Sequence, residues 1–266
     1  MPSRSESGIP SRRSLEINGS EDNHDTPGSW ESYYDELVPN ERIFREQARS
    51  YVRRLKEELP FHPGAKILDF GCGCGFVADL LAPQAAMLFL WDSSANMRQR
   101  ARMNTAHHEN VRFLDFSDSV STQLNERFDL ILVNSVVQYM APDEFSHWLK
   151  RWKNMLSPGG RLLISDIIPL KSQYVFDLWD FFAFCVRKGL VLPALRVILS
   201  EYMRYQKVKG TRSLRPMGRD ELIHKAAALG CRVEFLSRNL SHLGGRYTAI
   251  LSMEKRNDVA GQNVKT

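Results

Sequence analysis

The sequence predicts an α/β fold, a doubly wound and mostly parallel sheet of seven strands with an antiparallel edge hairpin and a helical cap insertion. Three observations predict it. Short apolar runs alternate with helical stretches between residues 65 and 168, a glycine-rich loop follows the first run, and two further strand-like runs flank Gly244 and Gly245. Strands that alternate with helices need crossover connections, which implies a parallel sheet covered on both faces.

The first predicted element is an amphipathic helix that begins at Glu41. Its apolar positions recur at spacings of three and four until Pro60 ends the pattern. Strands are expected at 65–70, 86–92, 111–116, 128–136 and 161–168, and helices at 76–82, 94–104, 143–156 and 219–229. The runs 231–240 and 246–253 are separated by a Gly-Gly turn, so we expect them to pair antiparallel at a sheet edge.

Composition indicates the domain organisation. The chain has 266 residues, of which 43% are hydrophobic and 25% charged, and this excludes collagen-like, coiled-coil and wholly disordered classes. Residues 1–28 contain four apolar side chains and no aromatic one, so we expect a disordered tail without the apolar segment of a secretory signal. The main domain is placed at 29–253 and a polar tail at 254–266. Four cysteines in so long a chain favour a reducing, cytoplasmic compartment.

Residues 171–217 form the expected cap insertion. From Lys171 to Arg219 there are ten bases and three acids, a net charge of +7, in a chain whose total is +5. Charged residues interrupt the apolar stretch 174–199, which excludes a membrane span. The aromatic side chains could roof an apolar substrate, and bases such as Arg204, Lys207 and Lys209 could meet an anionic group or a membrane surface. An ordinary two-helix cap with a solvated charged face fits equally.

A glycine-rich loop carries the strongest functional signal. Residues 67–75 read ILDFGCGCG, and glycines at the carboxyl edge of a sheet let a ligand approach the backbone. Gly73, Gly75 and Ala78 have the spacing of a dinucleotide loop. Asp69, however, directly precedes the loop, where a carboxylate would oppose a pyrophosphate but suit a cation. Asp92 ends the second strand, the usual place for a carboxylate that binds ribose hydroxyls.

Four blocks together resemble the class I S-adenosylmethionine-dependent methyltransferases. They are residues 68–75 (LDFGCGCG), 90–97 (LWDSSANM), 128–139 (FDLILVNSVVQY) and 156–164 (LSPGGRLLI), in the family's order and spacing over residues 60–170. The resemblance implies a Rossmann-like fold and S-adenosylmethionine as the cofactor. The 134–139 segment is more similar to small-molecule and natural-product methyltransferases than to nucleic-acid enzymes, so no nucleic-acid partner is expected.

The resemblance also implies roles for single residues. The resemblance implies that the methionine part of the cofactor is held by Asp69, Gly71, Gly73 and Gly75. It implies that the ribose and adenine are bound by Asp92, Ser93, Met97, Asp115 and Phe116. Ser117 and Asp118 are alternatives to Asp115. The methyl-bearing side would be lined by Asn134, Ser135 and Val136. Tyr34 resembles a tyrosine that closes over the cofactor, and a simple packing aromatic explains it equally.

Transfer of a methyl group to oxygen or nitrogen can require removal of a proton by a group within hydrogen-bond reach. Catalytic candidates at the strand ends are Tyr139, Asp166 and His242, with Gln138 also near. Cys72 and Cys74 have a Cys-x-Cys spacing but no second ligand cluster accompanies them, so no metal site is expected.

We therefore predict an S-adenosylmethionine-dependent methyltransferase that modifies an O, N or C nucleophile of a small, apolar or aromatic metabolite. Two alternatives stay open. An NAD-dependent oxidoreductase would retain the glycine loop and Asp92 but leave Asp69 unexplained. A non-catalytic nucleoside-binding or membrane-surface protein would keep the fold and the basic cap, which permits a peripheral membrane contact. The sequence specifies no oligomeric state.

Overall fold

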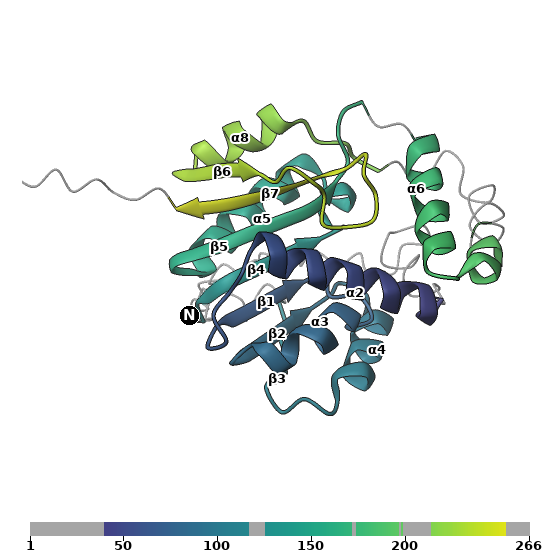
Figure 1. Ribbon diagram of the computed structural model, residues 1–266. Coiled ribbons are helices and arrows are strands. Elements are labelled where there is room, and N and C mark those ends of the chain that lie inside the picture. Colours follow the sequence, from purple (N-terminus) through teal and green to yellow (C-terminus); the bar gives the residue numbers. More distant parts are fainter. Residues whose placement is uncertain (1–39, 117–125, 172–173, 197, 199–213, 254–266) are drawn as a thin grey trace, which may run out of the picture.

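The computed structural model describes residues 40–116, 126–171, 174–196, 198 and 214–253. Seven strands form one sheet in the order β3-β2-β1-β4-β5-β7-β6 (Figure 1). The strands are β1 Lys66–Phe70, β2 Met87–Trp91, β3 Val111–Phe113, β4 Phe128–Asn134, β5 Leu156–Ile167, β6 Cys231–Phe235 and β7 Tyr247–Met253. The predicted doubly wound, mostly parallel sheet is confirmed.

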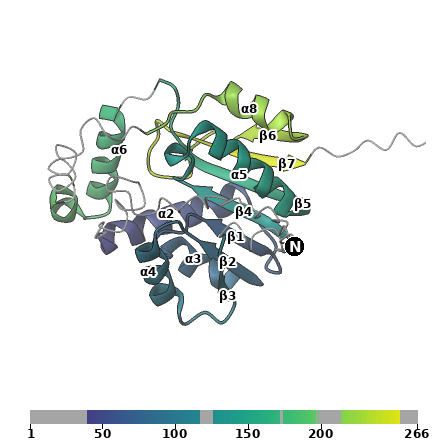
Figure 2. The same cartoon turned by 180° about the vertical axis from the view of Figure 1, so that it is seen from behind.

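Helices cover both faces of the sheet. They are α2 Glu41–Glu58, α3 Phe76–Leu81, α4 Ala95–Thr105, α5 Pro142–Met155, α6 Tyr174–Arg187 and α8 Arg219–Ala227, with short 3-10 helices η1 Ala82–Gln84 and η3 Val137–Tyr139. Helices α2, α3 and α4 pack on one face, while α5 and α8 pack on the other (Figures 1 and 2). Each predicted helix outside the cap is found within two residues of its expected ends.

The last two strands pair antiparallel as expected, and their order in the sheet determines where the loop between them lies. Strand β6 is the edge strand, whereas β7 lies between β6 and β5 and pairs antiparallel with both. Because β7 runs against the parallel strands, its amino end lies at their carboxyl edge. The loop that precedes β7, residues 236–246, therefore reaches the edge where the glycine loop also lies.

Helix caps explain where the two helices beside the glycine loop begin. The Asn40 side chain accepts a hydrogen bond from the Ile43 N–H at 3.3 Å at the start of α2, and Ser94 accepts from the Met97 N–H at 3.1 Å at the start of α4. Both are preferred N-cap residues that satisfy otherwise unpaired N–H groups of the first turn. The cap on α4 places Met97, which is buried, beside the end of β2.

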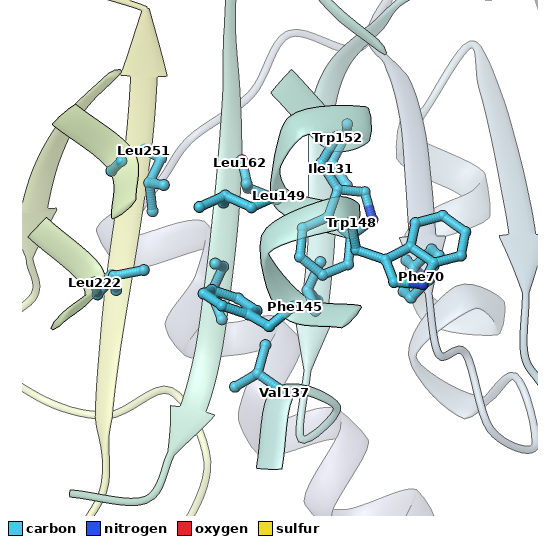
Figure 3. Close-up of a cluster of buried hydrophobic side chains, with 14 of the residues drawn as sticks. Phe70, Ile131, Val137, Phe145, Trp148, Leu149, Trp152, Leu162, Leu222 and Leu251 are labelled. Carbon is cyan, nitrogen blue, oxygen red and sulfur yellow. The ribbon is translucent and has the colours of Figure 1, made fainter. Parts of the chain in front are cut away.

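A large aromatic cluster fills the face beneath α5 (Figure 3). Trp152 is fully buried and meets the Phe70 ring edge-on with 5.0 Å between centroids. Trp148 also contacts Phe70, at 4.5 Å. Because Phe70 is the last residue of β1, this cluster anchors the strand end from which the glycine loop departs.

The cap stands at the carboxyl end of the sheet, where α6 and a helical segment at 191–196 lie beyond the ends of the strands (Figure 1). Much of the predicted insertion at 171–217 lies outside the described residues, including Arg204, Lys207 and Lys209. In the described part of the chain, no helix combines the length and the apolarity needed to cross a membrane.

Candidate functional site

A cleft of about 350 Å³ opens at the carboxyl ends of β1, β2, β4 and β5. Its walls include residues predicted to bind the cofactor and residues predicted to be catalytic. They are Asp69, Gly71, Gly73, Asp92, Ser93, Met97, Asn134, Ser135, Val136, Tyr139, Asp166 and His242. These residues span 174 positions of the sequence and come together because parallel strands end at one edge. That edge is where open α/β sheets bind ligands.

The glycine loop turns sharply between β1 and α3. The Gly71 and Cys72 N–H groups both donate to the carbonyl of Trp91, at 2.7 and 3.0 Å, which ties the loop to the end of β2. Gly71 and Gly73 have φ values of +80° and +53°, a region that favours glycine. A Cβ on Gly71 would lie 2.3 Å from a methyl group of Val136, whereas a Cβ on Gly73 would meet no atom within 4 Å. The absent side chain at Gly73 therefore leaves space at the cleft wall.

Asp69 is buried at the base of the cleft. Burial raises the pKa of this carboxyl to about 7, and the negative charge of Asp92 adds to the shift. Its Oδ2 atom is buried and has no hydrogen-bond partner. A buried carboxylate without a partner is costly, so this atom points to a ligand that carries a positive charge or a donor.

Asp92 links the loop to the start of α4. Its Oδ2 accepts a hydrogen bond from the Gly73 N–H at 2.8 Å, and its Oδ1 accepts from the Ser94 N–H at 3.0 Å. These bonds hold the carboxylate at the cleft wall beside Ser93 and Met97, as expected for a group that receives ribose hydroxyls. Such a carboxylate would serve any nucleoside ligand.

The other half of the cleft is built where β4 and β5 end. Ser135 and Asp166 have φ values of +56° and +64°, unusual for residues other than glycine. The Ser135 hydroxyl donates to Asp166 Oδ2, which joins the residue after β4 to the irregular end of β5. Strained backbone of this kind persists only where its surroundings hold it in place, and it gathers at functional sites.

Asp166 is the centre of a buried polar network. Its Oδ1 accepts from the Asn239 side chain at 3.0 Å and from Ser241, and its Oδ2 accepts from Arg246 at 2.8 Å. Burial alone would raise the pKa of Asp166, but the charge of Arg246 and these hydrogen bonds outweigh it and lower the pKa. Both carboxylate oxygens are therefore engaged, and Asp166 is ionised at neutral pH.

His242 lies in the loop before β7 and packs against the inner face of the cap. Its ring centroid is 4.9 Å from that of Phe184 and 5.8 Å from that of Phe181. Burial lowers the pKa of His242 to about 4, so its imidazole is neutral at pH 7. Tyr139, at the end of η3, lines the same cleft.

Some predicted cofactor residues do not line the cleft. Gly75 begins α3 with a φ of +76°, and a Cβ there would lie 3.0 Å from Ala101, so its backbone and its packing on α4 explain the glycine. Asp115 is exposed beyond β3, and Phe116 packs behind the cleft against Trp91 at 5.5 Å. Tyr34, Ser117 and Asp118 lie outside the described residues. These roles stay predictions.

Several cleft residues were not identified from the sequence. Helix α2 contributes Phe44, Gln47, Ala48 and Tyr51, and the remaining walls include Trp91, Glu144, Trp148 and Ser241. The phenol of Tyr51 bonds to the Ser165 hydroxyl at 3.1 Å, and that hydroxyl donates to Asn134 at 2.9 Å. Tyr51 was assigned to the apolar face of its helix, and periodicity alone does not distinguish a core position from a cleft position.

The cysteines of the loop behave as small buried side chains. Burial raises the pKa of the Cys72 thiol well above its ordinary value and that of Cys74 to about 11, so both are neutral thiols. Among the described residues, one group of three potential metal ligands occurs, formed by Asp79 on α3 and by His107 and His108 in the turn after α4. None of these three lines the cleft.

The cleft residues fit S-adenosylmethionine. Asp69 offers a buried, unpartnered carboxylate oxygen to the ammonium group of the cofactor, and the space at Gly73 lets the cofactor approach the loop. Asp92 and Met97 line the same cleft, and their roles toward the ribose and the base stay predictions. An NAD pyrophosphate would bring negative charge toward Asp69, which disfavours it.

Comparisons with known proteins agree with this fit. The family "Methyltransferase domain" matches residues 44–233. The chain is 32% identical over 128 residues to a ubiquinone biosynthesis O-methyltransferase of Dinoroseobacter shibae, and 32% over 124 residues to a trans-aconitate 2-methyltransferase of Deinococcus radiodurans. These alignments cover 47% and 46% of the chain and 50% and 45% of the relatives, so the chain spans about half the length of the curated relatives it matches.

Solved structures share the fold at low identity. The DhpI-SAH complex superposes with a TM-score of 0.54 at 15% identity, over 85% of this chain and 96% of that one. The pyocyanin biosynthetic protein PhzM gives 0.57 at 15% identity, over 85% and 62%. With the family match extending over more than half of its residues, the chain belongs to the class I S-adenosylmethionine-dependent methyltransferases.

Proposed function

We propose that this protein transfers a methyl group from S-adenosylmethionine to an O, N or C nucleophile of a small, apolar or aromatic metabolite. One observation carries the proposal: a single cleft joins the cofactor wall at Asp69 and Gly73 to a second wall at Tyr139 and His242. The cofactor supplies a methyl group on a positively charged sulfur. The protein supplies a partly apolar cleft that holds the reacting groups in line and excludes water.

The acceptor side favours an apolar or aromatic ring. Phe181 and Phe184 of the cap contact the His242 ring, so the cap turns an aromatic surface toward this end of the cleft. A neutral imidazole can accept a hydrogen bond, and a proton, from an acceptor hydroxyl or amine. We assign this role to His242, with Tyr139 as a second hydrogen-bonding group.

Asp166 acts as a positioning residue in this scheme. Its carboxylate is engaged by Ser135, Asn239 and Arg246, so it is poorly placed to take a proton from the acceptor. It links the residue after β4 and the end of β5 to the loop that carries His242. The acceptor wall is thereby fixed relative to the cofactor wall.

The proposal also includes the predicted cofactor contacts of residues that do not line the cleft or lie outside the described residues. Asp115 or Phe116 would approach the adenine, and Tyr34 would cover the cofactor. The proposed compartment is the cytoplasm, in keeping with four cysteine thiols that are all buried and unbridged.

The test measures binding and turnover separately. Calorimetry with S-adenosylmethionine and with NAD distinguishes the two cofactors. Transfer of a labelled methyl group is then followed with panels of phenols, catechols, aromatic amines and aromatic carboxylic acids. We expect binding of S-adenosylmethionine alone and turnover of at least one panel.

Variants assign the roles. His242→Gln should lower kcat on the order of a hundredfold with unchanged cofactor affinity, as expected for loss of a general base. His147→Gln, on the exposed surface of α5, is the matched control. NAD binding without S-adenosylmethionine binding would overturn the cofactor assignment. Cofactor binding with no product from any panel would favour the non-catalytic alternative, and parental turnover by the His242 variant would transfer the proton-accepting role to Tyr139.

A further inference from the structure

The outer face of the cap helix α6 is apolar, the reverse of an ordinary surface helix. Phe176, Trp179 and Val186 recur at spacings of three and seven on one side of the helix, and they are 57%, 67% and 48% exposed. Leu192 and Leu195, in the helical segment that follows, are 75% and 50% exposed. Contiguous exposed apolar side chains of this kind mark a contact surface.

The two acidic residues of α6 are both engaged by the loop before β7. Asp177 accepts from the Arg246 guanidinium at 3.0 and 3.1 Å, and Asp180 accepts from the Gly244 N–H at 2.7 Å. Both carboxylates therefore bind the loop before β7. They are the two acids in residues 171–196, so both negative charges of this segment are engaged by that loop.

Exposed bases accompany the apolar side chains along the same segment. Lys171, Arg187 and Arg196 are exposed, whereas Lys188 pairs with Glu46 of α2 at 3.1 Å. Aromatic and leucine side chains flanked by bases form the pattern with which amphipathic helices lie in the interface of an anionic membrane. A second copy of the chain in a symmetric contact would bring these positive groups against one another. The charge therefore favours anionic lipid over self-association.

We propose that the outer face of the cap, defined by Phe176, Trp179, Val186, Leu192 and Leu195, docks on an anionic lipid surface. The inner face of the same helix contacts His242, so docking would bring the acceptor end of the cleft close to the bilayer. The docking does not depend on methyl transfer, and its test uses no turnover.

The test is sedimentation of the full chain with vesicles of phosphatidylcholine and of an equimolar mixture of phosphatidylcholine and phosphatidylserine. We expect binding to the mixed vesicles that falls with added salt. Phe176→Gln/Trp179→Gln should weaken it more than tenfold through lost apolar burial. Arg187→Gln/Arg196→Gln should weaken it by about fivefold per base.

The matched control is Met103→Gln/Ile223→Gln, which changes two exposed apolar side chains on α4 and α8 and should bind as the parent does. Light scattering and thermal unfolding of all variants complete the test. Equal binding to neutral vesicles, or none to mixed ones, would overturn the proposal. A parental dimer that Phe176→Gln/Trp179→Gln makes monomeric would assign the face to a second copy. If the parent does not bind vesicles and Phe176→Gln/Trp179→Gln lowers the Tm, the apolar face would be assigned to a contact with another segment of this chain.

Discussion

Asp69 is expected to make the protein without cofactor less stable as the pH rises. Its pKa is about 7 in the folded protein against an ordinary value of 3.8, because burial and Asp92 disfavour the charge. Between these two pH values the folded chain keeps a proton that the unfolded chain releases, so stability declines from about pH 4 to about pH 7. Three pKa units correspond to about 4 kcal/mol, an upper limit to the penalty above pH 7.

Asp69→Asn removes the charge and keeps the shape. The variant should exceed the parent in free energy of unfolding by up to about 4 kcal/mol at pH 8 and by little at pH 4. The same variant should bind S-adenosylmethionine at least tenfold more weakly at pH 8, because a hydrogen bond to a charged group contributes about 1.5 to 3 kcal/mol. Urea unfolding at the two pH values and calorimetry measure the two effects.

The control is Glu109→Gln, which neutralises an exposed acid in the loop between α4 and β3. It should alter stability little at either pH. A difference between Asp69→Asn and the parent that is equal at pH 4 and pH 8, or absent at both, would refute the reasoning, because a gain that comes from removing the buried charge must grow with pH.

Three further outcomes follow from described contacts. Gly73→Leu should abolish cofactor binding at a modest cost in Tm, since a φ of +53° strains a leucine but its Cβ overlaps no atom, whereas Gly71→Ala should lower the Tm further because its methyl group overlaps a valine; calorimetry and thermal unfolding separate the two. Trp152→Ala should cost about 3 to 5 kcal/mol in urea unfolding, but Trp152→Phe less than about 1.5 kcal/mol, because the buried indole N–H has no partner to lose. Arg246→Met should destabilise the protein by about 3 to 5 kcal/mol at neutral pH, since it leaves Asp166 buried without its cation; a loss that does not shrink toward low pH, where Asp166 is protonated, would contradict this.

The sheet and the residues that line the glycine-loop side of the cleft could be predicted because their signals are local. The apolar runs, the glycine loop and the acids at the ends of β1 and β2 each lie in a few consecutive residues. Strand β5 shows the limit of such patterns. It begins at Leu156, five residues before the predicted start, because Leu156 pairs with Phe128 across a bulge and draws the Ser-Pro-Gly-Gly segment into the strand.

The acceptor wall is less visible in the sequence. Asp166 and His242 were candidates from their places near strand ends, but the network that engages Asp166 depends on Asn239 and Arg246, which lie 73 and 80 residues away. No spacing rule connects these positions. The partnership of Arg246 with Asp177 likewise arises only when the cap lies over the loop before β7.

The internal position of β7 has a consequence for how the protein is made. The cofactor wall is complete in the chain by Val136, whereas the acceptor wall needs Ser241 and His242, and β5 has no partner on its outer side until residues 247–253 have been synthesised. A ribosome-bound chain that stops short of β7 would hold the means to bind the cofactor but not to receive an acceptor, and it would expose a long, mostly buried strand as a free edge. Under the proposed roles of the two walls, the acceptor end of the cleft is therefore completed only when synthesis reaches β7, which also covers the outer edge of β5.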